Sequence, residues 1–89
     1  MTVEPNDLLL FARVADAGSF SRAAVAAGLP KSTLSRRIAA LEAQLGERLL
    51  LRTTRRITLT HEGSAFLEDC QRLLSDLANA EGKMVADSR

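Results

Sequence analysis

Three glycines, at positions 18, 28 and 46, divide the first half of the 89-residue chain into stretches of helical periodicity. Glycine readily adopts the left-handed conformation with which many helices end, so each of these positions predicts a helix end. Asn6 and Ser19 are the predicted N-caps of the first two helices. The predicted helices cover residues 6–17, 19–27 and 31 to about 45.

The third predicted helix has one clear apolar face, because Leu34, Ile38, Leu41 and Leu45 are four, three and four residues apart. The short second helix is rich in alanine, and a turn containing Gly28 joins the two. A tight glycine turn followed by a helix with a polar, basic outer face is typical of a helix-turn-helix. An ordinary helical hairpin in a three-helix bundle is the alternative.

Residues 49–60 lose the helical period and contain two short apolar runs on either side of Thr53-Thr54-Arg55-Arg56. Alternation of apolar and polar residues in the second run indicates a half-buried strand. We therefore predict a β-hairpin with a basic tip, which is the wing of a winged helix-turn-helix. Thr60 is the predicted N-cap of a final helix.

The final predicted helix carries an apolar seam with alternating steps of four and three residues, as in a coiled coil. Leu67 and Leu74 widen this seam, so the helix can contact its own domain on one edge and a second helix on the other. A small domain cannot cover so long a helix, which predicts a homodimer; packing entirely across its own domain is the alternative. The predicted interface residues are Phe66, Cys70, Leu73, Leu77, Ala80 and Met84.

The net charge of +1 conceals a strong segregation of charge along the chain. Residues 1–30 carry a net charge of −1, residues 31–56 carry +5, and residues 57–89 carry −3. Positive charge is thus concentrated on the third helix and the wing, the two elements that a winged helix-turn-helix presses onto a duplex. This coincidence favours binding of double-stranded DNA. A small helical dimer that docks another protein through its basic face is the competing function.

Helix geometry assigns roles to these side chains. At about 100° per residue, Arg36 points away from the apolar stripe and is the best candidate for contact with a base edge in the major groove. Three smaller side chains can reach bases or phosphates: Ser32, Thr33 and Ser35. Lys31 can make either kind of contact. Arg37 lies nearer the core boundary, which favours a phosphate contact or a structural ion pair.

On the predicted wing, Arg55 and Arg56 lie at the tip, where a guanidinium can enter the minor groove. Arg52, at the end of a strand, is the expected phosphate anchor.

Several classes of function are excluded. One cysteine and one histidine cannot form a Cys-rich zinc site, and we expect no metal and no cofactor. His61 and Cys70 lie too far apart on one helix to act as a catalytic pair, so we expect no enzyme. Three phenylalanines without Trp or Tyr argue against stacking of single-stranded nucleic acid. No apolar run approaches the length of a membrane span, so a cytoplasmic protein without membrane contact is expected.

The run AGSFSRAAVAAGLPKSTLSRRIAALEAQLGERLLLRTTRRITLTHEG resembles the N-terminal DNA-binding domain of LysR-type transcriptional regulators. The resemblance covers about residues 6–86. It implies a mainly α winged helix-turn-helix over 1–60 and a linker helix over 61–89 that pairs antiparallel in a homodimer on partly palindromic promoter DNA. It also implies tetramers in full-length members and a small-molecule inducer bound by a larger domain that this chain lacks.

Carried over by position, the family's DNA contacts fall on residues 31, 32, 33, 35 and 36 of the recognition helix and on Arg52, Thr53 and Arg55 around the wing. Many members have Ser-Gln-Pro where this chain has Pro30-Lys31-Ser32, so the usual serine cap is missing and Lys31 replaces a glutamine. Leu50 stands where phenylalanine is frequent.

Overall fold

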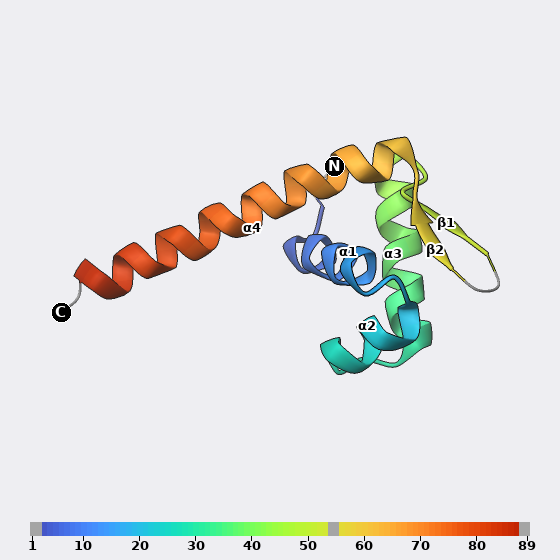
Figure 1. The fold of residues 1–89 in the computed structure, drawn as a ribbon, viewed down its shortest axis with the longest axis horizontal. Helices are drawn as coiled ribbons and strands as arrows, with labels where there is room; N and C mark the ends of the chain where they lie inside the picture. Colours follow the sequence, from blue (N-terminus) through green and yellow to red (C-terminus); the bar gives the residue numbers. More distant parts are fainter. Residues whose placement is uncertain (1–2, 54–55, 88–89) are drawn as a thin grey trace.

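A computed structural model describes residues 3–53 and 56–87, with side chains as far as residue 82. It confirms the predicted mainly helical, winged helix-turn-helix architecture followed by one long helix (Figure 1). The elements are α1 (Pro5–Ala17), α2 (Phe20–Ala27), α3 (Lys31–Leu45), β1 (Leu50–Arg52), β2 (Ile57–Leu59) and α4 (His61–Asp87).

Glycines end the first three helices as predicted. Gly18, Gly28 and Gly46 all have φ near +68°, the left-handed region that favours glycine. At the start of α2, the Ser19 hydroxyl accepts a hydrogen bond from the Arg22 N–H at 3.3 Å, which confirms the predicted cap. The predicted cap at Asn6 is wrong. Helix α1 begins at Pro5. The fixed φ of proline suits the first helical position, and its lack of an N–H costs nothing there, because an N–H at this position would have no partner within the helix.

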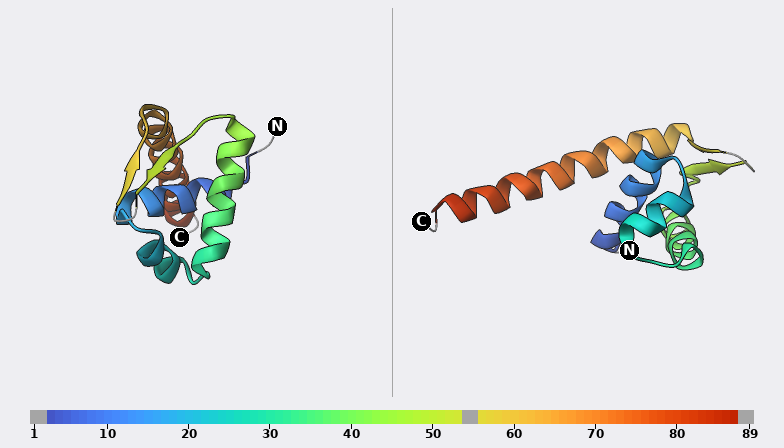
Figure 2. Two further views of the ribbon diagram at one scale, coloured as in Figure 1. Left: turned by 90° about the vertical axis from the view of Figure 1, so that its right-hand side faces the viewer. Right: turned by 60° about the horizontal axis from the view of Figure 1, so that its bottom comes forward.

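Helix α1 lies at the centre of the domain, between α4 on one side and α2 on the other, and it also packs against α3 (Figures 1 and 2). Phe11 and Val14 of α1 are fully buried, as are the three central apolar residues of α3, Leu34, Ile38 and Leu41. This contact fixes the rotation of α3 about its own axis. The face of α3 opposite this contact is therefore exposed to solvent.

The wing is a two-stranded antiparallel hairpin with the register Leu50↔Leu59, Leu51↔Thr58 and Arg52↔Ile57. Thr53, which follows β1, bonds to Arg56, which precedes β2, through both its backbone and its side chain. The Thr53 N–H donates to the Arg56 carbonyl at 2.9 Å, and the Thr53 hydroxyl accepts from the Arg56 N–H at 3.1 Å. A threonine side chain thus helps to hold the ends of the two strands together.

Helix α4 has 27 residues and leaves the domain as an arm, so that the molecule extends over 50 Å in its longest dimension (Figures 1 and 2). Only its first turns pack on the body of the domain, where Cys70 is buried and the Phe66 ring lies 5.6 Å from that of Phe11. Further along, Leu73 and Leu77 are 58% and 56% exposed.

The predicted dimer seam is therefore divided. Cys70 is buried by its own domain where α4 packs on α1, which corrects its assignment to an interface between chains. Phe66 also packs on its own domain but is only half-buried, so its predicted place in the interface stays a prediction. Leu73, Leu77 and Ala80 are exposed, and the side chain of Met84 lies outside the described part of the chain. No helix in the described ranges is long and apolar enough to cross a membrane.

Two glycines of α4 provide a matched stability test. A Cβ at Gly63 would overlap the carbonyl of Leu49, only 2.8 Å from its carbon, whereas a Cβ at Gly82 would meet nothing within 4 Å. We expect Gly63→Ala to lower the free energy of unfolding by about 2 kcal/mol or more, because backbone must move. Gly82→Ala should leave it unchanged or raise it by up to about 1 kcal/mol. Urea denaturation at one protein concentration measures both; equal effects would contradict the close packing at Gly63.

Candidate nucleic-acid interface

The outer face of α3 carries the side chains that the sequence assigned to base contact. Arg36, Lys31 and Ser32 are exposed, and Thr33 and Ser35 are half-buried. Exposed alanines at 39, 40 and 43 continue this face. Since Leu34, Ile38 and Leu41 are fully buried on the opposite side, the surface is a smooth helical face with one long cationic side chain near its middle.

A cleft of about 390 Å³ separates this face from the wing. It lies between the start of α2, the first turns of α3 and the hairpin, and it has a polar floor. It brings together five of the ten predicted contact residues, which come from α3 and from the wing: Lys31, Ser35, Arg52, Thr53 and Arg56. Residues far apart in the sequence therefore line one cleft, and three of them are basic: Lys31, Arg52 and Arg56.

Arg52 connects the three elements around this cleft. Its Nη1 donates a hydrogen bond of 2.9 Å to Ser35 Oγ of α3. Its Cζ lies 4.3 Å from the centroid of the Phe20 ring, at the start of α2, in cation–π geometry. Sequence reasoning identified Arg52 only as a phosphate anchor and missed Phe20. The available signal was an aromatic residue beside the Ser19 cap, but its partner is 32 positions away in the sequence and only the fold pairs them.

Arg37 does not face the cleft. Its Nε and Nη2 both lie 2.9 Å from Oδ1 of Asp7 in α1. The side chains of Arg37 and Asp7 are 36% and 11% exposed, so this ion pair is partly buried. Of the two roles expected for Arg37, the structure shows the ion pair, because the 100° turn from Arg36 directs its side chain towards α1.

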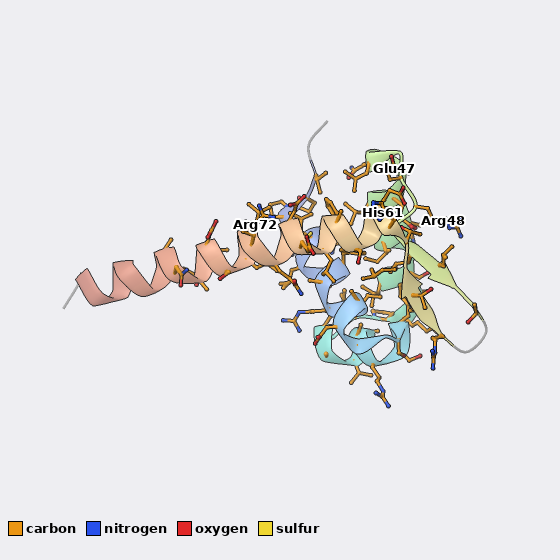
Figure 3. The ribbon with its side chains drawn as sticks, turned by 45° about the horizontal axis from the view of Figure 1, so that its top comes forward. Glu47, Arg48, His61 and Arg72 are labelled. Atoms are coloured by element: carbon orange, nitrogen blue, oxygen red, sulfur yellow. The ribbon has the colours of Figure 1, made fainter. Side chains whose placement is uncertain are left out.

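The residues considered for catalysis or metal binding, His61 and Cys70, do not line this cleft. His61 is exposed at the start of α4, and Arg72 lies further along the same helix (Figure 3). Burial, together with the nearby Asp69 carboxylate, raises the pKa of Cys70 to about 11, so its thiol stays protonated at neutral pH.

Within the described ranges, no three His, Cys, Asp or Glu residues are grouped to hold a metal ion. Arg55 lies outside the described residues.

The fold and this surface define a winged helix-turn-helix domain with a long C-terminal helix. Residues 5–64 match the family model described as bacterial regulatory helix-turn-helix protein, lysR family. Because the match covers more than half of the chain, the protein belongs to the LysR family of transcription regulators.

Curated relatives and solved structures agree. The chain is 52% identical over 81 residues to an HTH-type transcriptional regulator of Xanthomonas campestris pv. campestris (strain 8004), covering 91% of this chain and 24% of that protein. It is 53% identical over 74 residues to an HTH-type transcriptional repressor of Pseudomonas aeruginosa (strain UCBPP-PA14), covering 83% of this chain and 23% of that protein. It therefore spans about a quarter of the length of these relatives.

Two solved complexes have the same fold. The crystal structure of the BenM DNA-binding domain with catB site 1 DNA matches with a TM-score of 0.89 and 32% identity, over 93% of this chain and 92% of that one. The complex of the CbnR DNA-binding domain with DNA matches with a TM-score of 0.87 and 38% identity, over 97% and 99%. At these identities the likeness extends beyond the general fold to the family.

The two neighbouring arginines of α3 should differ in their effect on stability. We expect Arg37→Ala to lower the free energy of unfolding by about 2 kcal/mol, because it leaves the Asp7 carboxylate without its partner. Arg36→Ala, at an exposed position, should change it by no more than about 0.5 kcal/mol. A double-mutant cycle with Asp7→Asn, measured by urea denaturation, should show a coupling of about 1 kcal/mol. Additive losses would contradict the ion pair.

Proposed function

We propose that this chain binds double-stranded promoter DNA in a sequence-specific manner, as a homodimer, in the bacterial cytoplasm where such DNA lies. The observation that carries the proposal is the set of exposed basic side chains on α3 and the wing: Lys31, Arg52 and Arg56 line the cleft between these elements, and Arg36 lies on the outer face of α3. The DNA complexes of two family members with this fold support it. In this proposal residues 1–60 form the reading unit and residues 61–89 the dimerisation helix.

Helix α3 is the proposed recognition helix. Its width suits the major groove, and the exposed alanines allow close approach to the groove walls. Arg36 projects furthest from the core and can donate two hydrogen bonds to O6 and N7 of a guanine. Residues earlier on α3 complete the proposed contacts with bases and phosphates: Lys31, Ser32, Thr33 and Ser35.

The wing is the proposed minor-groove element. Arg55 and Arg56 are the residues that the sequence predicts at its tip, where a guanidinium responds to the width of the groove. Arg52 and Thr53 line the cleft beside α3, which supports the proposal that they contact phosphates. Because the Arg52 guanidinium is already held by Ser35 and Phe20, little side-chain entropy remains to be lost when it contacts a phosphate.

Arg36 offers the sharpest test of base reading. On a duplex selected from random sequences by the purified protein, Arg36→Ala should reduce the preference over scrambled duplex by about 1–3 kcal/mol, the usual worth of a bidentate base contact. Fluorescence anisotropy on both duplexes measures this preference. If affinity falls equally on selected and scrambled duplex, Arg36 contacts phosphate and the assignment is wrong.

The exposed edge of α4 is the proposed dimer contact, in the antiparallel pairing that the family resemblance implies. Leu73, Leu77 and Ala80 lie on this edge beyond the point where α4 leaves its own domain, and Met84 continues the heptad spacing. Two large apolar side chains that are more than half exposed are typical of an interaction surface, and a second copy of α4 would bury them. Within a longer protein we further propose tetramers and a domain that binds a small-molecule inducer.

Oligomeric state tests this edge. The chain has a mass of 9.6 kDa, and sedimentation at tens of micromolar should give about twice that value. The double variant Leu73→Asn, Leu77→Asn should sediment as a single chain, since it removes apolar area from the contact. The matched control is Val25→Asn on α2, where an 84% exposed valine lies off the proposed edge and the dimer should persist. An unchanged dimer in the double variant would exclude this interface.

A further inference from the structure

The direction in which α4 leaves the domain is set by a small group of residues, which we call the α3–α4 joint: Glu42, Leu49, Thr60 and Gly63. They come from α3, the loop before β1, the single residue between β2 and α4, and the first turn of α4. None of them is among the proposed DNA or dimer contacts. Figure 3 labels Glu47, Arg48 and His61, which are neighbours of these residues in the sequence.

Glu42 holds the loop that leads from α3 into the wing. Its Oε2 accepts hydrogen bonds from two consecutive backbone N–H groups, those of Leu49 at 2.8 Å and Leu50 at 3.2 Å. Both leucines are almost completely buried. Buried amides without partners are costly, so a carboxylate that serves two of them at once fixes the loop firmly to α3.

Thr60 holds the other side of the same loop to α4. Its N–H donates to the carbonyl of Leu49 at 3.0 Å, and its hydroxyl donates to the carbonyl of Arg48. The same hydroxyl oxygen accepts from the N–H of Gly63 at 2.9 Å, as the N-cap of α4. Leu49 is thus bonded to α3 through its N–H and to the start of α4 through its carbonyl.

Gly63 brings α4 into direct contact with this loop. The residue is buried, and a Cβ there would overlap the carbonyl of Leu49. Backbone therefore packs on backbone, with no flexible side chain between α4 and Leu49. Such a contact allows very little change in the angle between α3 and α4.

The length of α4 amplifies any change at the joint. Leu73 and Leu77 lie about 15–21 Å along the helix from Gly63, at about 1.5 Å per residue. A tilt of about 10° at Gly63 would therefore displace them by about 3 Å, which is close to the 3.4 Å rise of one base pair. In a dimer joined through this edge, the angle at the joint sets the distance between the two recognition helices.

We infer that Glu42 is a positioning residue which, through the α3–α4 joint, determines the spacing between the two DNA half-sites that the dimer accepts. The inference rests on the proposed function. It requires that half-site spacing be read by the angle between α3 and α4, whereas base identity is read by α3 itself.

The experiment compares duplexes whose two half-sites are separated by different numbers of base pairs, together with a duplex holding one half-site. The wild type should show a sharp optimum of spacing. Glu42→Ala should bind the single half-site within about 3-fold of the wild type. Its preference for the optimal spacing over a spacing one base pair longer or shorter should fall by at least about 5-fold.

Two variants serve as controls. Glu42→Gln retains an oxygen that can accept from the same two N–H groups and should keep the wild-type spacing profile. Glu47→Ala removes the same charge from an exposed side chain five residues away, and should also keep it. If Glu42→Ala does not fold by circular dichroism, Glu42→Asp, which keeps the carboxylate but shortens its reach by one carbon, should show the flattened profile in its place.

Three results would overturn the inference: a wild-type spacing profile in the folded variant, a loss that is equal on every duplex, or a wild type without any preferred spacing. A readout without DNA separates this failure from that of the proposed function. Spin labels at Ala40 of α3 and Asn79 of α4, with excess unlabelled chain, should give a broader distance distribution in Glu42→Ala than in the wild type. An equally narrow distribution contradicts the joint even if the protein binds no DNA.

Discussion

The buried contact between α1 and the apolar stripe of α3 is the constraint on which the rest of this structure depends. Phe11 and Val14 meet Leu34, Ile38 and Leu41 without exposing any of the five. A close-packed contact of this kind does not allow α3 to rotate about its axis. Every polar side chain of α3 therefore has a fixed direction, and the surface offered to DNA is a consequence of how the core is packed.

Adjacent residues acquire different roles from this constraint. Arg36 is free on the outer face, Arg37 pairs with Asp7 of α1, and Ser35 accepts from Arg52 of the wing. In the described part of the chain, no buried side-chain nitrogen or oxygen lacks a hydrogen-bond partner. The Arg37–Asp7 ion pair is thus distinct from the exposed Arg36 proposed to read bases, so stability and base recognition can be altered separately at these two positions. Ser35 and Arg52, by contrast, both join elements of the fold and are proposed DNA contacts.

The sequence predicted the features that depend on local chemistry or on a repeated period. Four such features follow from residues close in the chain, and the structure confirms them. They are the helix ends at glycines, the helix caps at Ser19 and Thr60, the apolar stripe of α3, and the alternation of apolar and polar residues in β2. Features that depend on distant partners were not predictable. The double role of Glu42, the Phe20–Arg52 contact and the division of the α4 seam at Cys70 arise only when α1, α3, the wing and α4 are assembled.

The central claim is that the basic surface of α3 and the wing reads the sequence of double-stranded DNA. It is tested most directly by the affinity of the wild-type protein for a selected duplex and for its scrambled counterpart, measured between 50 and 200 mM salt. We predict that affinity for both falls steeply with salt, by about 10³ or more if six or more phosphates are contacted, while the selected duplex remains preferred throughout. Affinity that does not depend on salt, or a preference that is absent at every salt concentration, would contradict the claim.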